Sequence, residues 1–148
     1  YGQEYIRNYV RQHITLANQL LEHMSMDERF ELTGSSLALA FFRLKAVCEL
    51  TSKLLEKINA RKNIYMIPAF YREKIIIRFV ICGMDPKESD IEYAWNEIKT
   101  VADELFAEIE QEKIDVNNNE KEIMNDKVNE ITENISKCLD INDEKTKH

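Results

Sequence analysis

The amino-acid sequence predicts an α+β fold in which helices cover a small, largely antiparallel sheet. Segments with apolar residues at helical spacing alternate with short segments rich in β-branched and aromatic residues. Their order is helix, strand, strand, helix, strand, strand, helix. Only three glycines and two prolines occur in 148 residues, which is too few for a turn-rich all-β fold. Hydrophobic residues make up 44% of the chain, enough for one core.

The first half of the chain is expected to form one helix and two strands. Apolar residues recur every three or four positions between residues 6 and 24, which predicts an amphipathic helix. His13 lies in this stripe, and a core or interface histidine with satisfied nitrogens explains it more simply than a ligand. Phe30–Thr33 and Leu37–Leu44 are predicted strands, separated by a turn at Gly34-Ser35-Ser36. The second strand begins with residues that are apolar on both faces, as in a central strand.

The second half adds a helix, two strands and a long helix. The helix is predicted from Glu49 to Ala60. A short strand, Ile64–Pro68, is expected to end at its proline, because proline cannot donate a backbone hydrogen bond. Lys74–Cys82 is the strongest strand in the sequence, with four isoleucines, a valine and a phenylalanine.

The last core helix is expected to begin near Ser89 and to end at about Glu112. Either Ser89 or Asp90 can cap its first turn.

The composition changes after this helix, and the chain is predicted to divide there. Residues 1–112 would form the folded domain, and residues 113–148 a mobile acidic tail with partial helix. Asn117-Asn118-Asn119 is interpreted as a linker between them. Further along, apolar residues follow one another at steps of four and three, a heptad-like pattern formed by Met124, Val128, Ile131, Ile135 and Cys138. So short a segment is a marginal helix unless a partner packs on it.

Charge and composition exclude several classes of function. The net charge is −7 and no basic block occurs, so nucleic acid is not an expected partner. No apolar run approaches the roughly 18 residues that a membrane span needs. The sequence also lacks the GxGxxG, P-loop, GxSxG and HExxH motifs.

The cysteines indicate the cellular compartment of the protein, and the first residue indicates whether the chain is part of a longer protein. Cys48, Cys82 and Cys138 are odd in number and far apart, which argues against a disulfide framework or a metal site. They fit a reducing compartment, and we expect a cytoplasmic protein. No signal peptide precedes the first helix. The chain opens with Tyr1 rather than methionine, so it is expected to be either a processed protein or a fragment of a longer one.

Arg78 is the residue that a purely structural interpretation explains least well. Strand alternation places it on a face with Ile76 and Val80, inside a strand that is otherwise apolar on both faces. A guanidinium there needs an anion, because burying it alone is costly. The anionic group is either structural, a nearby carboxylate or a helix end, or a ligand bound at a cleft. Arginine suits a carboxylate ligand because its planar fork donates two hydrogen bonds. Arg43, at the end of its strand where water can reach it, is expected to be structural.

Several short motifs, in this order and spacing, resemble the C-terminal region of aromatic amino acid decarboxylases. They are Phe42-Arg43-Leu44-Lys45, Leu55-Glu56-Lys57-Ile58-Asn59, Ile67-Pro68-Ala69, Ile77-Arg78-Phe79-Val80-Ile81-Cys82 and Asp90-Ile91-Glu92-Tyr93-Ala94-Trp95-Asn96-Glu97-Ile98. With the opening Tyr1-Gly2, Tyr9-Val10-Arg11, His13 and Arg29-Phe30-Glu31, the resemblance covers about residues 1 to 110. These are the group II, fold-type I pyridoxal phosphate enzymes, which include dopa, tyrosine and histidine decarboxylases.

One stretch is similar to a particular branch of these enzymes. Cys82-Gly83-Met84-Asp85-Pro86, followed by Ser89-Asp90-Ile91, resembles the insect alpha-methyldopa hypersensitive proteins, which are similar to aromatic acetaldehyde synthases. Such enzymes decarboxylate and oxidatively deaminate an aromatic amino acid, giving an aldehyde in place of an amine.

The resemblance implies a fragment of a homodimeric, pyridoxal phosphate-dependent enzyme that releases CO2 from an aromatic amino acid. This small domain would pack on the enzyme's own large domain and close one wall of the active-site cleft. In this family the cofactor lysine follows a histidine, and no His-Lys pair occurs here. No catalytic or cofactor-binding residue is therefore expected in this chain, and the isolated chain should be inactive. The family pattern places Arg78 where related enzymes hold the substrate carboxylate, at the cleft wall.

Two rival functions come from other classes of protein. The order of elements is compatible with a free-standing regulatory module that senses amino acids, although the glycine-rich ligand loop of such modules is missing. The heptad-like tail is compatible with an interaction adaptor. Fold alone does not decide between these classes.

Overall fold

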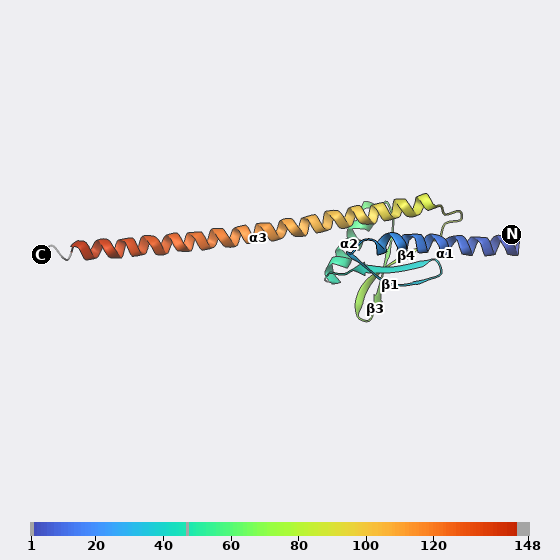
Figure 1. Ribbon diagram of the computed structural model, residues 1–148, viewed down its shortest axis with the longest axis horizontal. Helices are drawn as coiled ribbons and strands as arrows, with labels where there is room; N and C mark the ends of the chain where they lie inside the picture. The colour runs from blue at the N-terminus through green and yellow to red at the C-terminus, as the bar shows by residue number, and fades with distance from the viewer. Residues whose placement is uncertain (1, 47, 145–148) are drawn as a thin grey trace. The chain divides into compact units, whose positions relative to one another are not determined.

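The computed structural model describes residues 2–46 and 48–144, with side chains described for 2–46 and 49–136 (Figure 1). The chain forms two units, Tyr1–Leu105 and Phe106–His148. Its elements are α1 (Gln3–Ser25), β1 (Phe30–Ser36), β2 (Leu39–Leu44), α2 (Cys48–Arg61), β3 (Ile67–Tyr71), β4 (Lys74–Val80) and α3 (Glu88–Glu144). The predicted α+β class and element order are confirmed.

The four strands form one antiparallel sheet in the order β1-β2-β4-β3. The two strands that the sequence marks as most apolar, β2 and β4, therefore occupy its centre. One face of the sheet is packed against the helices, and its side chains at Ala40, Phe42, Leu44 and Ile77 have no exposed surface. The apolar stripes of α1 and α2, and of residues 88–105 of α3, complete this core.

The first hairpin differs from the sequence prediction. Gly34-Ser35-Ser36 was expected to be a turn, but Ser35 pairs with Ala40 and Ser36 with Leu39, so all three residues belong to β1. The register shifts between Leu32 and Gly34, which marks a β-bulge. Cross-strand pairing continues past this irregularity and overrides the local turn preference of glycine and serine, moving the turn to Leu37 and Ala38.

The second hairpin, formed by β3 and β4, also differs from the sequence prediction in where its strands end. Pro68 was expected to end a strand, but it lies inside β3 and pairs with Ile77. Because β3 is an edge strand, the missing N–H of Pro68 can face away from the sheet without loss of a ladder hydrogen bond. The strand predicted to reach Cys82 ends at Val80, where the pairing with Leu39 of β2 also ends.

The last helix is longer than predicted. It begins at Glu88, and the Asp90 carboxylate accepts a hydrogen bond from the backbone N–H of Lys87 at 2.9 Å, as in a capping box. The helix continues to Glu144, so both the predicted end at Glu112 and the linker at Asn117-Asn118-Asn119 are wrong. No glycine or proline follows Pro86, and asparagine costs a helix only about 0.7 kcal/mol per residue at most, so nothing in this stretch breaks the helix. The mobility expected for residues 113–148 stays a prediction.

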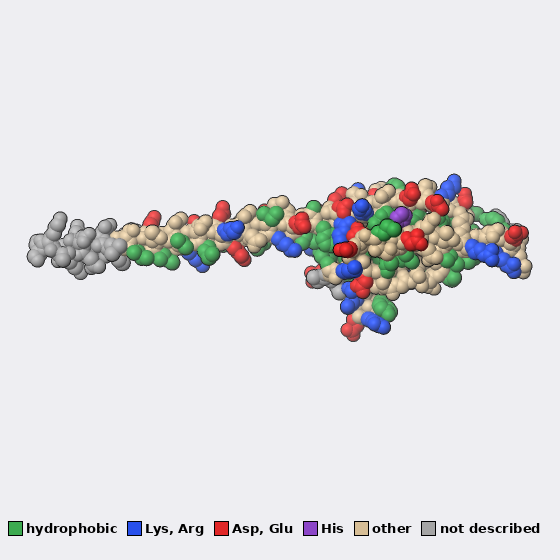
Figure 2. All heavy atoms as spheres, viewed as in Figure 1, with side chains coloured by type: hydrophobic (Ala, Val, Ile, Leu, Met, Phe, Trp, Pro, Cys, Tyr) green, Lys and Arg blue, Asp and Glu red, His purple; other side chains and the backbone are tan. Residues whose placement is uncertain are grey.

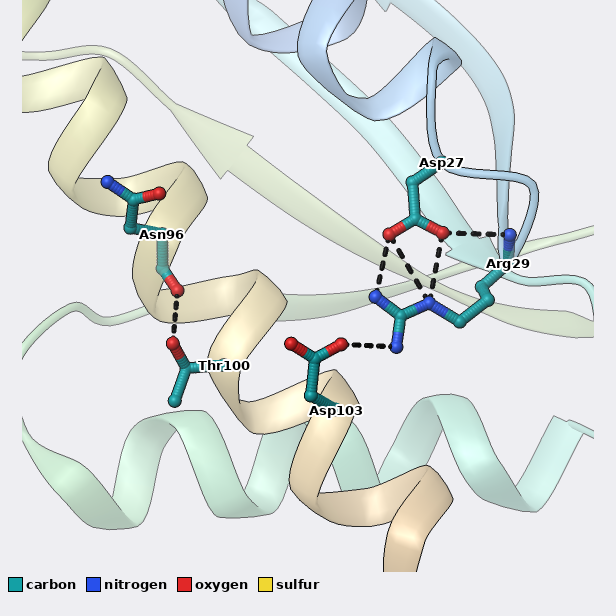
Figure 3. A network of polar contacts seen from close by, with 5 residues as sticks. All are labelled: Asp27, Arg29, Asn96, Thr100 and Asp103. Atoms are coloured by element: carbon teal, nitrogen blue, oxygen red, sulfur yellow. Dashed lines mark hydrogen bonds and ion pairs between the residues drawn. The ribbon is translucent and has the colours of Figure 1, made fainter.

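Arg29 links the loop after α1 to the first part of α3 (Figure 3). Its guanidinium forms a two-pronged contact with Asp27, with Nη2 2.7 Å from Oδ2 and Nε 2.9 Å from Oδ1. A second ion pair joins its Nη1 to Oδ1 of Asp103 at 2.7 Å. The side-chain hydrogen bond from Arg29 lowers the pKa of Asp27 below its usual 3.8. The same bond raises the pKa of Arg29.

This pairing predicts an acid-dependent contribution to stability. Because the folded-state pKa of Asp27 is lowered, its contribution is complete above the unfolded value of about 4 and is lost as the pH falls through the folded value. We expect Asp27→Asn to lower the free energy of unfolding by about 1 kcal/mol at pH 7. In urea titrations, the difference in free energy of unfolding between the two proteins should shrink as the pH falls below about 4. A gap that stays constant on acidification, or widens, would contradict this assignment.

Candidate functional site

Arg78 lies at the centre of the sheet face opposite the helices, which we call the open face. On this face it stands between Phe41 of β2 and Ile67 of β3, its direct partners in the two ladders. Val80 and Ile67 are 39% and 42% exposed, so apolar side chains flank this cation, and the charged Glu31, Arg43 and Lys74 lie farther out on the same face. The alternation predicted for the strand is confirmed, since the preceding residue, Ile77, pairs with the fully buried Phe42 and is itself fully buried on the face packed against the helices.

The guanidinium of Arg78 is only partly satisfied. Its Nε atom is buried and makes no hydrogen bond to the residues that the structure describes. Within that part of the chain, no carboxylate forms an ion pair with this side chain. The structural ion pair that would explain Arg78 most simply is therefore not formed by the described residues. A buried donor without a partner costs about 1–3 kcal/mol, which an incoming anion could recover.

Two hollows indent the open face, and Arg78 is not among the residues that line either of them. One of about 240 Å³ is bordered by β1, β2 and the β3–β4 hairpin, and its lining includes Glu31, Arg43, Tyr71, Lys74 and Ile76. The other, of about 330 Å³, is more apolar and is lined in part by Phe41, Ala69, Phe70, Tyr71 and Ile76. Thr33, Tyr71 and Ile76 line both hollows. Sequence reasoning missed these residues, because only strand pairing brings them together.

Arg43 has the structural role expected of it, but in a different setting. It forms an ion pair with Glu31, its direct partner across β1 and β2. Its side chain is only 13% exposed, so it is less accessible to water than its place near a strand end suggested. Arg43 and Arg78 thus lie on the same face but differ in their contacts. Arg43 is paired with a carboxylate, whereas the Nε atom of Arg78 has no partner among the described residues.

The segment between β4 and α3 is attached to α1 through backbone carbonyls. The hydroxyl of Tyr9 donates to the carbonyl of Gly83 at 3.2 Å, and Nε2 of His13 lies 2.9 Å from the same oxygen. Nδ1 of His13 lies 2.8 Å from the carbonyl of Tyr9, and Nε2 of Gln12 donates to the carbonyl of Pro86 at 2.7 Å. His13 is 4% exposed and both its nitrogens face carbonyl oxygens. This geometry agrees with the core role predicted for it.

Other kinds of site are not evident in the described part of the chain. No group of three or more histidine, cysteine, aspartate or glutamate side chains is arranged there to hold a metal ion. Among the same residues, no helix is both long and apolar enough to cross a membrane.

Comparison with known proteins connects the chain to a family of enzymes. Over 105 residues the chain is 50% identical to the 3,4-dihydroxyphenylacetaldehyde synthase of Aedes aegypti, a match that covers 71% of this chain and 20% of that protein. The chain belongs to the aromatic-L-amino-acid decarboxylase and 3,4-dihydroxyphenylacetaldehyde synthase family. It is also 37% identical over 105 residues to the aromatic-L-amino-acid decarboxylase of Drosophila lebanonensis, covering 70% of this chain and 26% of that protein.

The fold agrees with this family assignment. The TDC of Oryza sativa, crystallised with pyridoxal phosphate and tryptamine, superposes with a TM-score of 0.68 at 22% identity, over 71% of this chain and 25% of that one. At this identity the superposition shows the fold alone. No family model matches the chain. The chain spans about a fifth to a quarter of the length of its decarboxylase and synthase relatives, so it corresponds to one part of such an enzyme.

Proposed function

We propose that this chain is a C-terminal part of a pyridoxal phosphate-dependent aromatic amino acid decarboxylase, and that it closes one wall of the active-site cleft. The observation that carries the proposal is the 37% identity to a decarboxylase, combined with an apolar sheet face that the described helices leave uncovered. The rest of the enzyme, which we infer to be its large domain, would cover that face. The complete enzyme would act as a homodimer in the cytoplasm. The exposed free thiol of Cys82 is consistent with such a reducing compartment.

We infer that the cofactor and the substrate carboxylate are held by different parts of the enzyme. The chain has no His-Lys pair, so we place the covalent anchor of pyridoxal phosphate outside it. Pyridoxal phosphate supplies the electron sink that lets an amino acid lose its carboxylate as CO2. What this chain contributes is Arg78, whose unpartnered Nε fits an anionic group such as the substrate carboxylate. The apolar residues around Arg78 would exclude water from that part of the cleft.

A second activity is favoured by a specific observation. Identity to the Aedes aegypti aldehyde synthase is 50%, against 37% for the decarboxylase, over the same number of residues. An aldehyde synthase would consume dioxygen and water as well, and would release the aromatic aldehyde, CO2, ammonia and hydrogen peroxide in place of CO2 and the amine. Incubating the complete enzyme with dopa and separating the products by chromatography distinguishes the two activities.

The isolated chain provides a direct test of whether cofactor attachment and decarboxylation require the rest of the enzyme. We expect it to form no borohydride-reducible adduct with pyridoxal phosphate and to release no CO2 from dopa, because its proposed role needs the large domain. The complete parent protein, treated in the same way, is the positive control. A stable adduct mapped to one lysine of this chain would refute the proposal. A monodisperse chain that melts cooperatively at high concentration would instead favour the free-standing amino-acid-sensing module, since the proposed fragment should self-associate through its open face.

A further inference from the structure

The helical segment after the compact unit presents an apolar stripe to solvent. We call this stripe the tail seam. It consists of Met124, Val128, Ile131 and Ile135, which are 66%, 55%, 58% and 56% exposed. Their steps of four, three and four residues place them on one side of the helix. Figure 2 shows hydrophobic side chains gathered along one edge of this part of the helix.

A helix of this composition gains little from its own sequence. Its middle contains Asn117-Asn118-Asn119, and its seam contains β-branched residues, all of which are weaker helix formers than alanine or leucine. Isolated helices gain little stability in water, those shorter than about 12–15 residues being marginal even when their residues are favourable, and most helical stability in proteins comes from packing of an apolar face. The tail seam is the apolar face available for such packing.

The distribution of charge indicates what covers the seam. In heptad terms, Val128 and Ile135 occupy a positions, and Met124 and Ile131 occupy d positions. Carboxylates would oppose the approach of a second copy if they flanked this seam at e and g. Between Met124 and Ile135 these flanking positions are held instead by Asn125, Lys127, Thr132 and Asn134.

The carboxylates of this stretch lie elsewhere on the helix. Asp126, Glu130 and Glu133 occupy c and f positions, away from the seam. A basic partner helix would be recognised through acidic e and g residues, and none is present between Met124 and Ile135. The arrangement allows an acidic chain, with a net charge of −7, to approach another copy of itself without bringing carboxylates together.

We propose that the tail seam pairs with the same seam of a second copy of this chain, forming a short coiled coil. The proposal is independent of the function proposed for the open face, because all four seam residues lie outside the unit Tyr1–Leu105. The β-branched residues at both a positions suit such pairing. With so few seam residues the association is weak, and the helix content of the tail therefore depends on protein concentration.

The experiment compares two isoleucines that differ in position but not in exposure. Ile135 lies in the seam and Ile123 lies outside it at a c position, and both are 56% exposed. Ile135→Lys and Ile123→Lys each add one positive charge, so electrostatic effects are matched. Far-UV ellipticity and sedimentation velocity of the 148-residue chain would be measured from about 10 μM to about 1 mM.

For the unchanged chain, helicity and sedimentation coefficient should both rise with concentration. Ile135→Lys should weaken the association at least about tenfold, whereas Ile123→Lys should leave it within about twofold. Helicity is the deciding readout, because association through the open face alone would not change the helix content of the tail. Helicity independent of concentration, or equal effects of the two substitutions, would overturn the proposal. So would helicity that rises only when a basic amphipathic peptide is added.

Discussion

In the complete enzyme, replacing Arg78 with lysine is expected to lower kcat/KM by roughly ten- to a thousandfold. Lysine keeps the positive charge but loses the planar fork that donates two parallel hydrogen bonds to a carboxylate. Each power of ten corresponds to about 1.4 kcal/mol of transition-state stabilisation. The large effect follows from the position of Arg78, at the middle of an apolar face with its Nε unpartnered among the described residues. Steady-state kinetics with an aromatic amino acid would measure it.

Two further variants separate a role at the cleft from a purely structural one. Arg78→Leu should reduce activity far more than thermal stability if Arg78 shapes the site. If Arg78 only balances a structural carboxylate, the leucine variant should lose stability while the folded enzyme keeps near-normal turnover. Arg43→Lys is the matched control, because Arg43 lies on the same face but is already paired with Glu31. Near-normal kinetics for both Arg78 variants would remove this residue from the proposed site.

Asn59→Leu is expected to destabilise the chain by about 2–4 kcal/mol. The side-chain amide of Asn59 acts for Met66 as a strand partner would: Oδ1 accepts from the Met66 N–H and Nδ2 donates to its carbonyl, both at 2.9 Å. Met66 is 1% exposed, so both of its backbone groups would be buried without a partner in the leucine variant. The two bonds also direct the chain from α2 into the edge strand β3.

Urea unfolding at low protein concentration would measure this effect. Asn8→Leu is a suitable control, because Asn8 is exposed on α1 and the same change there should alter stability by no more than about 0.5 kcal/mol. Equal losses for the two variants would show that the amide of Asn59 contributes no more than a surface residue. A loss at Asn59 accompanied by a drop in the denaturant slope would instead indicate a change in the compactness of the unfolded state.

The sequence predicted the elements that are defined by their own side chains. Helical spacing located α1 and α2, and the run of isoleucines located β4 and the unusual position of Arg78. Errors arose where the deciding interaction lies elsewhere in the chain. Ser35 and Ser36 resemble turn residues by themselves, but their pairing with β2 makes them strand. Asn59 carries no local signal at all, since its importance comes from a backbone segment seven residues away.

The same distinction applies to the candidate site. Arg78 could be singled out because a charge inside an apolar strand is anomalous wherever the strand lies. The hollows on the open face could not be located, because they depend on which strands are neighbours and on the hairpin that joins β3 to β4. The uncovered state of the open face is likewise a property of the packing, in which the described helices pack on the opposite side of the sheet.

The attachment of the β4–α3 segment to α1 has a consequence for how this protein can diverge. Tyr9, Gln12 and His13 all bond to main-chain oxygens, which every amino acid carries in the same place. Met84, between the two anchored residues, is 78% exposed. Substitutions at such a position leave the hydrogen bonds to the backbone carbonyls unchanged. The backbone path of the segment can therefore be conserved while its exposed side chains vary. Descendants of one ancestor could therefore acquire distinct surfaces at this point and still keep a common backbone.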